Sequence, residues 1–289
     1  MQIGIGLPAT IPGASGSLIL DWSRRAEARG FSSLGAIDRL VYPNYEPLVT
    51  LAAAAAVTQK IRLVTTVLIA PLRDTALLAK QAASLGNLSG GRLTLGLGVG
   101  GREDDYRAAG IPFKSRGHRF DEQLAEMKKI WSGQSLSADV GAIGPPPVHP
   151  GGPEILIGAY SPAAIQRVGR WADGFVSGGI PAEQARPLYD LAEQSWKAAG
   201  RPGKPRFVAG AYVGLGPNAA ALSAAYIRNY YGFIGPAVEG MAQSVPSTPA
   251  VVEGLIASFD AIGLDELILW PCIANLDQVD LLADTAKLK

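Results

Sequence analysis

A glycine-rich run between residues 87 and 106 is the stretch whose residue types and spacing point most directly to chemistry. Gly96, Gly98 and Gly101 have the G-x-G-x-x-G spacing of dinucleotide-binding loops. Such a loop follows the first strand of a βαβ unit, and an acidic residue about 20 positions later ends the next strand. Here three strand-like runs come first, and Asp121 lies in a helical pattern. A Rossmann-type nicotinamide site is therefore the weaker interpretation. More simply, the glycines let a flat ring or a phosphate approach the backbone.

Residue types that act as nucleophiles, bases or metal ligands are scarce. The chain has one cysteine, Cys272, and two histidines, His118 and His149. A nucleophilic cysteine needs a neighbouring base, and no such Cys/His arrangement is evident. A single cysteine forms no intrachain disulfide, so we expect a reducing, cytoplasmic environment. Two histidines and one cysteine are too few for the usual His/Cys centres, so we expect no metal.

Composition limits the possible partners. Of the 289 residues, 48% are hydrophobic and 18% charged, and the net charge is +1. Such a chain can bury a large core, and its charge argues against nucleic acid as the main partner. The apolar run 51–57 is too short to span a bilayer. The first residues read as a strand rather than a signal peptide. We therefore expect a small-molecule substrate, with no nucleic-acid or membrane partner.

Short apolar runs alternate with longer amphipathic ones along the whole chain. The runs typical of strands are residues 2–7, 33–37, 61–69, 93–97, 154–157, 173–177, 207–215 and 266–270. Helical patterns follow each of them. Continuous apolar strands indicate a parallel sheet covered on both faces. Eight strand-then-helix units predict a (β/α)8 TIM barrel, forming one domain over residues 1–289. A doubly wound sheet is the alternative.

One segment breaks the alternation. Residues 132–152 are rich in glycine and proline and show no periodicity, which predicts an insertion loop. Loops of this length are often functional lids or disordered. We expect substrate contacts to vary here and in the C-terminal third.

In such a barrel the active site lies at the C-terminal ends of the strands. That rule selects Asp38 and Arg39 as candidate catalytic residues. The candidate cofactor-binding residues are Asp38 again, Thr66, Val67, Gly98, Gly100, Gly158, Ala159, Tyr160, Ser177, Gly178 and Gly179. Most of these are small or apolar, which favours a bound cofactor that supplies the chemistry. Helix N-termini near residues 158–161 and 177–179 could bind a phosphate.

Other candidates have simpler interpretations. Asp38 can also cap a loop or pair with Arg39. Residues 103–105 (EDD) could hold an acid/base carboxylate pair, although a charged loop edge is favoured. Trp270 is either barrel core or a platform for a ligand. The tyrosines at 226, 230 and 231 have helical spacing and are interpreted as packing.

The order of motifs resembles the bacterial luciferase-like superfamily of flavin- and deazaflavin-dependent oxidoreductases. The matching segments are 25–31 (RAEARGF) with Asp38, 46–47 (EP), 58–62 (TQKIR), 78–84 (LAKQAAS), 89–100 (SGGRLTLGLGVG), 110–113 (GIPF), 119–122 (RFDE), 157–158 (IG) and 172–175 (ADGF). The resemblance covers most of residues 1–180 and fades from 180 to 260. It implies a TIM barrel with an insertion, a flavin-type ring at the strand C-termini, and usually a homodimer.

Members of this superfamily divide mainly by cofactor. In the branch that uses the deazaflavin coenzyme F420, a non-proline cis peptide in the third strand forms a bulge behind the ring, and Thr66-Val67 stands at that place. Residues 157–162 (IGAYSP) and 173–179 (DGFVSGG) also look more like that branch. The resemblance therefore implies F420-dependent hydride transfer. An FMN-dependent monooxygenase that uses O2 and a non-catalytic flavin-binding protein are the alternatives.

The sequence also departs from part of that branch. In its sugar-phosphate dehydrogenases, a histidine follows the aspartate after the second strand, and a glutamate follows the glycine loop of the fourth. Arg39 and Gly101 stand at those places here. Dehydrogenation of a sugar phosphate is therefore not expected.

Overall fold

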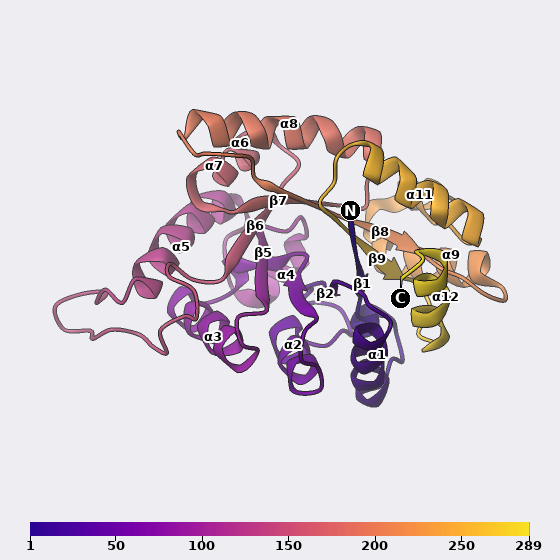
Figure 1. Cartoon of the computed structure of the whole chain (residues 1–289). Coiled ribbons are helices and arrows are strands. Elements are labelled where there is room, and N and C mark those ends of the chain that lie inside the picture. Colours follow the sequence, from indigo (N-terminus) through magenta and orange to yellow (C-terminus); the bar gives the residue numbers. More distant parts are fainter. Residues whose placement is uncertain (289) are drawn as a thin grey trace.

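The chain forms a closed barrel of parallel strands surrounded by helices, in a computed structural model that describes residues 1–288 (Figure 1). The strands are β1 (Gln2–Gly6), β2 (Ser33–Ala36), β3 (Arg62–Thr65), β4 (Leu68–Ile69), β5 (Leu93–Gly98), β6 (Glu154–Gly158), β7 (Gly174–Gly178), β8 (Arg206–Val213) and β9 (Glu266–Pro271). β3 and β4 are two parts of one barrel strand, since both pair with β5. The ring closes through these pairs, and all strand pairings are parallel. The predicted TIM barrel is confirmed, and the doubly wound and Rossmann alternatives are wrong.

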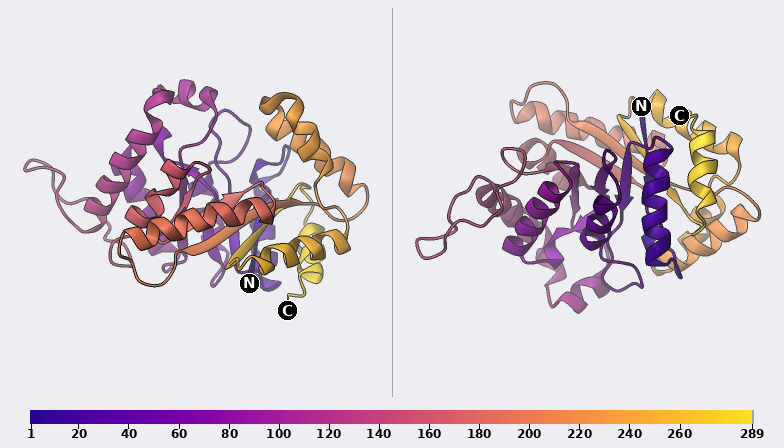
Figure 2. Two further views of the ribbon diagram at one scale, coloured as in Figure 1. Left: turned by 90° about the horizontal axis from the view of Figure 1, so that it is seen from above. Right: turned by 60° about the horizontal axis from the view of Figure 1, so that its bottom comes forward.

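Most helices follow the predicted alternation. They are α1 (Gly16–Ala28), α2 (Pro47–Ala56), α3 (Thr75–Leu88), α5 (Arg116–Trp131), α6 (Pro162–Ile165), α7 (Arg167–Trp171), α8 (Ala182–Ala198), α9 (Ala219–Tyr231), α11 (Pro249–Ala261) and α12 (Asp277–Thr285). Side chains cap several of them: Ser15, Glu46 and Asp74 accept the third backbone N–H of α1, α2 and α3. The first and last helices lie side by side and complete the helical ring (Figure 2), with an ion pair between Arg25 and Asp280.

Shorter elements occupy the connections. They are α4 (Glu103–Ala109), α10 (Val238–Gln243) and the 3-10 turns η1 (Pro8–Thr10), η2 (Ala70–Leu72), η3 (Phe113–Ser115) and η4 (Gly232–Ala237). The segment from α9 to α10 crosses the ends of other strands: Tyr226 hydrogen-bonds Thr10 at 2.7 Å, and Tyr42 donates to Asn229 at 2.5 Å. None of the described helices is long and apolar enough to cross a membrane.

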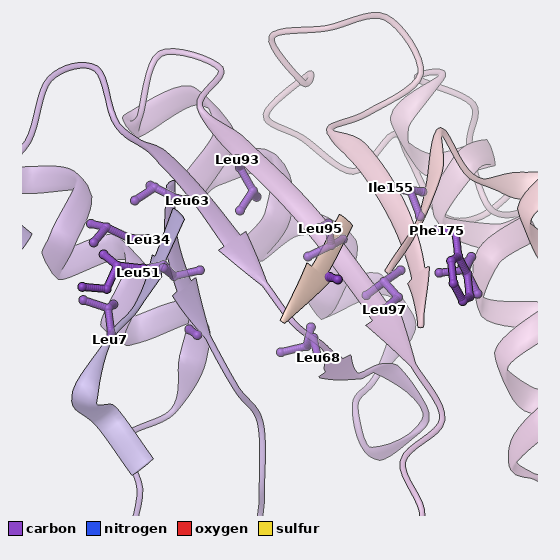
Figure 3. Packing of buried hydrophobic residues seen from close by; sticks show 14 of the residues in the cluster. Leu7, Leu34, Leu51, Leu63, Leu68, Leu93, Leu95, Leu97, Ile155 and Phe175 are labelled. Atoms are coloured by element: carbon purple, nitrogen blue, oxygen red, sulfur yellow. The ribbon is translucent and has the colours of Figure 1, made fainter. Parts of the chain in front are cut away.

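Two apolar layers hold the barrel together. The outer layer lies between strands and helices and includes Leu34, Leu63, Leu95 and Phe175, all fully buried (Figure 3). The inner layer fills the barrel and is formed by alternate strand residues such as Val64. Neighbouring strand residues point to opposite faces, so continuous apolar strands supply both layers. Each fully buried leucine or phenylalanine contributes about 1.5–3 kcal/mol relative to an exposed one.

The Trp270 ring lies inside the barrel near its C-terminal end. A Cβ built on Gly35 or Gly210 would come within 2.8 Å of the indole, and one on Gly6 would overlap it. These glycines therefore make room for one large ring inside the barrel.

The N-terminal end of the barrel is closed by charged residues at the first positions of the strands. Glu154 accepts hydrogen bonds from Thr94 at 2.6 Å, Arg62 at 2.5 Å and Arg206 at 2.7 Å. Burial by itself raises the pKa of Glu154, but Arg206, Thr94 and Arg62 together hold it below its ordinary value. The neighbouring Glu266 is fully buried and pairs with Arg206. Its other oxygen accepts hydroxyl bonds from Ser32 and Ser33.

The insertion 132–152 lies at this N-terminal end, because it joins the end of α5 to the start of β6. His149 reaches Gly91 just before β5, and Asn87 donates to the carbonyl of Pro146. Part of the insertion projects away from the barrel (Figure 1). The expectation that it forms a lid with substrate contacts is wrong, since active sites of such barrels lie at the opposite end.

Candidate active site

A cavity of about 390 Å³ opens at the C-terminal end of the barrel, which we call the mouth. It lies over the ends of β3 and β5 to β9. The lining residues are Thr66, Val67, Gly98, Val99, Gly100, Gly101, Phe120, Ile157, Gly158, Ala159, Tyr160, Ser161, Ala164, Arg167, Val176, Ser177, Gly178, Gly210 and Trp270. A mostly apolar, concave site with a few polar groups is typical of cofactor binding.

Val67 forms part of the cavity wall between two glycines. A Cβ on Gly98 would come within 2.7 Å of one Val67 methyl, and a Cβ on Gly158 within 2.6 Å of the other. The Thr66–Val67 peptide bond is cis, as predicted. Gly98 was expected to admit a ligand ring directly, and Gly158 to lie near a phosphate. Instead they admit the valine, and the valine faces the cavity.

Two hydroxyl groups in the cavity lack a protein partner. The Oγ atom of Ser177 and the Oγ1 atom of Thr66 are buried, and neither is hydrogen-bonded to any described residue. Both residues line the cavity. Buried hydroxyls are normally paired, and a side-chain rotation that turns these two donors into the cavity would suit a ligand with hydrogen-bonding groups.

The outer edge of the cavity holds one cation. Among the described residues that line the cavity, Arg167 is the only one with a positive side chain. It donates two 2.8 Å hydrogen bonds to Asp121, so its charge is already balanced. Nearby, Tyr160 donates to the carbonyl of Gly178 at 2.5 Å. Ser161 caps α6 through the N–H of Ala164.

Asp38 lies behind the cavity rather than in it. Its carboxylate accepts hydrogen bonds from both terminal nitrogens of Arg73, at 2.5 and 3.1 Å, and from the backbone N–H of Ile69 at 2.8 Å. Burial raises the pKa of Asp38, and the guanidinium of Arg73 opposes this shift. Asp38 therefore ties the end of β2 to β4, next to Val67.

Arg39 points the other way, toward α4. Its Nε atom donates to Asp105 at 3.2 Å and one terminal nitrogen donates to the carbonyl of Val41 at 3.0 Å. Asp105 also accepts the backbone N–H groups of Leu40 and Val41. The expected charged loop edge at 103–105 is thus the first turn of a helix, and Asp105 is buried in it.

The other side of the mouth is filled by aromatic rings. They belong to Tyr42, Tyr212, Tyr226, Tyr230 and Tyr231, and successive ring centroids lie 4.9 to 6.0 Å apart. Tyr212, Tyr226 and Tyr230 pack in one buried cluster with Trp270. The tyrosines on one face of α9 were predicted to pack against other side chains. They do so, and the place where they pack is the mouth.

The cavity brings together most of the predicted cofactor-binding residues. Those that line it are Thr66, Val67, Gly98, Gly100, Gly158, Ala159, Tyr160, Ser177 and Gly178. Gly179, Asp38 and Arg39 do not line the cavity. Sequence reasoning missed Arg167 and Phe120, which come from helices rather than strand ends. Trp270 belongs both to the core and to the cavity.

Comparison with known proteins identifies the family. The model of the luciferase-like monooxygenase family matches residues 1–258. The chain belongs to this family. A luciferase-like relative, an uncharacterised protein of Mycobacterium tuberculosis, is 31% identical over 208 residues, which are 62% of this chain and 71% of the relative.

Two solved structures place the luciferase-like fold among enzymes with different cofactors. An F420-dependent secondary alcohol dehydrogenase, bound to an F420–acetone adduct, has a TM-score of 0.80 and 16% identity, covering 98% of this chain and 97% of that one. A type II Baeyer-Villiger monooxygenase from Pseudomonas putida, in complex with FMN, has a TM-score of 0.73 and 18% identity, covering 100% and 99%. At these identities the likeness shows the fold alone. The chain is thus a member of the luciferase-like monooxygenase family, and its barrel fold is shared by an F420-dependent dehydrogenase and an FMN-bound monooxygenase.

Proposed function

We propose that this luciferase-like chain is an oxidoreductase that binds coenzyme F420 in the mouth cavity and exchanges hydride with a small organic substrate. The observation that carries the proposal is the pair of unpartnered hydroxyls, Thr66 and Ser177, in an otherwise apolar cavity. A flat ring with one polar edge matches that arrangement, because the edge can use both donors and the faces can contact apolar walls.

At the position of the phosphate, charge favours the deazaflavin over FMN. The phosphate of FMN is a monoester, which carries about −1.5 to −2 charges at pH 7. The phosphate of F420 is a diester with a single charge. Arg167 is already paired with Asp121 at the cavity edge, so little positive charge is left for a dianion. A monoanionic phosphate fits this edge better.

Each part of the cavity has a separate task in this proposal. Val67, held between Gly98 and Gly158, supports one face of the ring. Thr66 and Ser177 hydrogen-bond its polar edge, and residues 158–160 with Gly178 line the route toward the phosphate. Asp38 acts indirectly, by fixing β4 beside Val67. The bound deazaflavin supplies the hydride-exchanging carbon, and the protein supplies orientation and exclusion of water.

The second candidate is an FMN-dependent monooxygenase, which the FMN-bound Baeyer-Villiger structure favours. Such an enzyme must protect a reactive reduced flavin from water, and the apolar cavity would suit it as well. A flavin-binding protein without turnover is the third candidate.

Fluorescence titration of the purified protein with F420 and with FMN tests the proposal. We expect F420 to bind at least about tenfold more tightly, corresponding to roughly one charge-assisted hydrogen bond. Tighter binding of FMN would replace the proposal with the monooxygenase. Firm binding of either cofactor, with no oxidation of its reduced form by any acceptor and no reduction of its oxidised form by any donor in a panel, would favour the non-catalytic protein.

We also propose that the chain forms a homodimer through α2. This helix is almost wholly apolar, yet Val49 is 69% exposed, and neighbouring Leu77 on α3 is 54% exposed. A helix that is apolar all round is normally buried, so a second copy is the natural cover. Sedimentation should give twice the mass of one chain. Val49→Glu should give a single-chain mass, and a single-chain mass for the unmodified protein would refute the proposal.

A further inference from the structure

Arg39 keeps one hydrogen-bond donor unused at the mouth. The residue is 8% exposed, and its Nη1 atom is buried without a partner among residues 1–288. Asp105 and the carbonyl of Val41 fix the rest of the guanidinium. A buried charged donor without an acceptor is costly, so its retention calls for a ligand oxygen.

A second unused donor lies in the same region. The hydroxyls of Tyr212 and Tyr231 are 2.9 Å apart, and neither has another hydrogen-bond partner in the described part of the chain. Two hydroxyls carry two protons, and one bond between them uses only one. Burial raises the pKa of Tyr231 to about 12, so the spare proton is present throughout the physiological range.

These donors are linked by one series of aromatic contacts. The Arg39 guanidinium lies 5.4 Å from the Tyr42 ring and 5.5 Å from the Tyr230 ring. The Tyr230 ring lies 4.9 Å from that of Tyr231. Tyr212 and Tyr230 pack in the same buried cluster as Trp270, which also lines the cofactor cavity. The donors are therefore connected to the cavity wall through Trp270, and Arg39, Tyr212 and Tyr231 do not themselves line the cavity.

Phe233 covers this region from the solvent side. Its ring lies 5.9 Å from the Arg39 guanidinium and 4.3 Å from that of Arg102. The ring is part of η4, whose six residues are all exposed. Gly235 in the same turn has φ +65, which glycine adopts without strain. Because η4 buries so little, it can move aside at low cost and uncover Arg39.

We propose that Arg39 and the Tyr212–Tyr231 pair form a substrate subsite for the carboxylate or carbonyl oxygen of a planar, conjugated molecule. Arg39 and the tyrosine pair each supply one donor to that molecule, and the tyrosine rings and Trp270 contact its flat body. The assignment of this molecule as the hydride partner rests on the proposed function. The binding of this molecule at the subsite does not depend on the proposed function.

Calorimetric titration with benzoate tests the subsite, with benzyl alcohol as the matched probe that lacks an sp2 oxygen. Both are titrated into the F420-saturated and the cofactor-free protein. We expect benzoate to bind at least about tenfold more tightly than benzyl alcohol. Tyr231→Phe should weaken benzoate binding about tenfold and Arg39→Met about thirtyfold or more. Tyr45→Phe, at an exposed tyrosine whose hydroxyl bonds Ala14, should leave it unchanged.

The outcomes separate the two proposals. Arg39→Met removes the guanidinium that pairs with Asp105, so this variant protein could unfold. In that case the result for Tyr231→Phe decides the test, because that change removes only one oxygen from a half-buried ring. No benzoate binding by the unmodified protein, or equal binding by Tyr231→Phe and Tyr45→Phe, overturns the subsite whatever F420 does. If F420 fails to bind but benzoate binding depends on Tyr231, the subsite stands and the proposed function fails.

Discussion

The two ends of the barrel use their buried polar groups in opposite ways. At the N-terminal end, Glu154 and Glu266 meet arginines and hydroxyls from neighbouring strands, and each carboxylate accepts several hydrogen bonds. At the mouth, Thr66 and Ser177 are buried with no partner in the described chain. The carboxylates at the first end are satisfied without a ligand, although the Nε atom of Arg62 there has no partner, whereas the two hydroxyls at the second end are not satisfied.

This contrast separates stability from function. An unsatisfied buried hydroxyl costs roughly 1–3 kcal/mol, and alanine or valine would fill either position without that cost. The barrel keeps the hydroxyls, so something other than folding accounts for them. In TIM barrels the N-terminal face serves stability and the C-terminal face serves catalysis. Substitutions at the two ends should therefore affect different measurements.

The largest effect is expected at the N-terminal end, from Glu266→Ala. This change leaves the Arg206 guanidinium without one of its two carboxylates at a fully buried position. Removal of one partner of a buried ion pair costs about 3–5 kcal/mol. Denaturant unfolding should show this loss, while F420 affinity of the folded protein stays within about twofold. Glu103→Ala, at an exposed glutamate paired with Arg107, is the control and should change neither quantity. A loss of F420 affinity in Glu266→Ala would contradict the separation between stability at the N-terminal end and binding at the mouth.

An intermediate effect is expected at the mouth from Gly98→Ala. The added methyl would press on a Val67 methyl at 2.7 Å and push the valine into the cavity. Overpacking of this kind costs about 1–3 kcal/mol, and F420 binding should weaken at least as much in free energy. The double variant Gly98→Ala, Val67→Ala should recover most of the stability, because the clash is removed. If the stability losses of the two single substitutions simply add in the double variant, the glycine is needed for a contact other than the one with Val67.

A smaller effect concerns acid stability. The pKa of Glu154 is held below its ordinary value of 4.5 in the folded protein, so its contribution is complete above about pH 4.5 and is lost as the pH falls through the lowered pKa. Glu154→Gln should be less stable than the unmodified protein at pH 7. In unfolding measured from pH 7 to pH 3, the difference should stay constant to about pH 4.5 and then shrink. A difference that grows with acid would contradict this account.

Sequence reasoning went furthest where a repeating pattern fixes the answer. Eight continuous apolar runs predicted the strands and the barrel, and the strand-end rule then selected most of the cavity, from Thr66 to Gly178. The helical pattern expected after the third strand is α3 (Thr75–Leu88), since Asp74 caps its start and the glycines after Leu88 end it. In each case the deciding signal is local.

Long-range partners could not be predicted in the same way. Asp38 meets Arg73 and Asp105 meets Arg39 only after the chain has folded, so neither pairing has a signal in the spacing. The glycines at 98 and 158 were correctly placed in the site, but their neighbour Val67 was not foreseen as the reason. Helix α4 was missed although acidic residues fill its first turn and Gly110 caps its end with φ +68. That signal was present and was overlooked.

The smallest change tests the central claim most directly. Ser177→Ala removes a buried hydroxyl that no described protein atom uses. Paired measurements of denaturant unfolding and F420 titration should therefore diverge: stability unchanged or slightly higher, and F420 affinity about five- to tenfold weaker, the usual worth of one hydrogen bond. Thr66→Val should show the same result, with stability unchanged or slightly higher and F420 affinity weaker. Loss of stability with unchanged F420 affinity would contradict the claim that the mouth keeps its hydroxyls for a ligand.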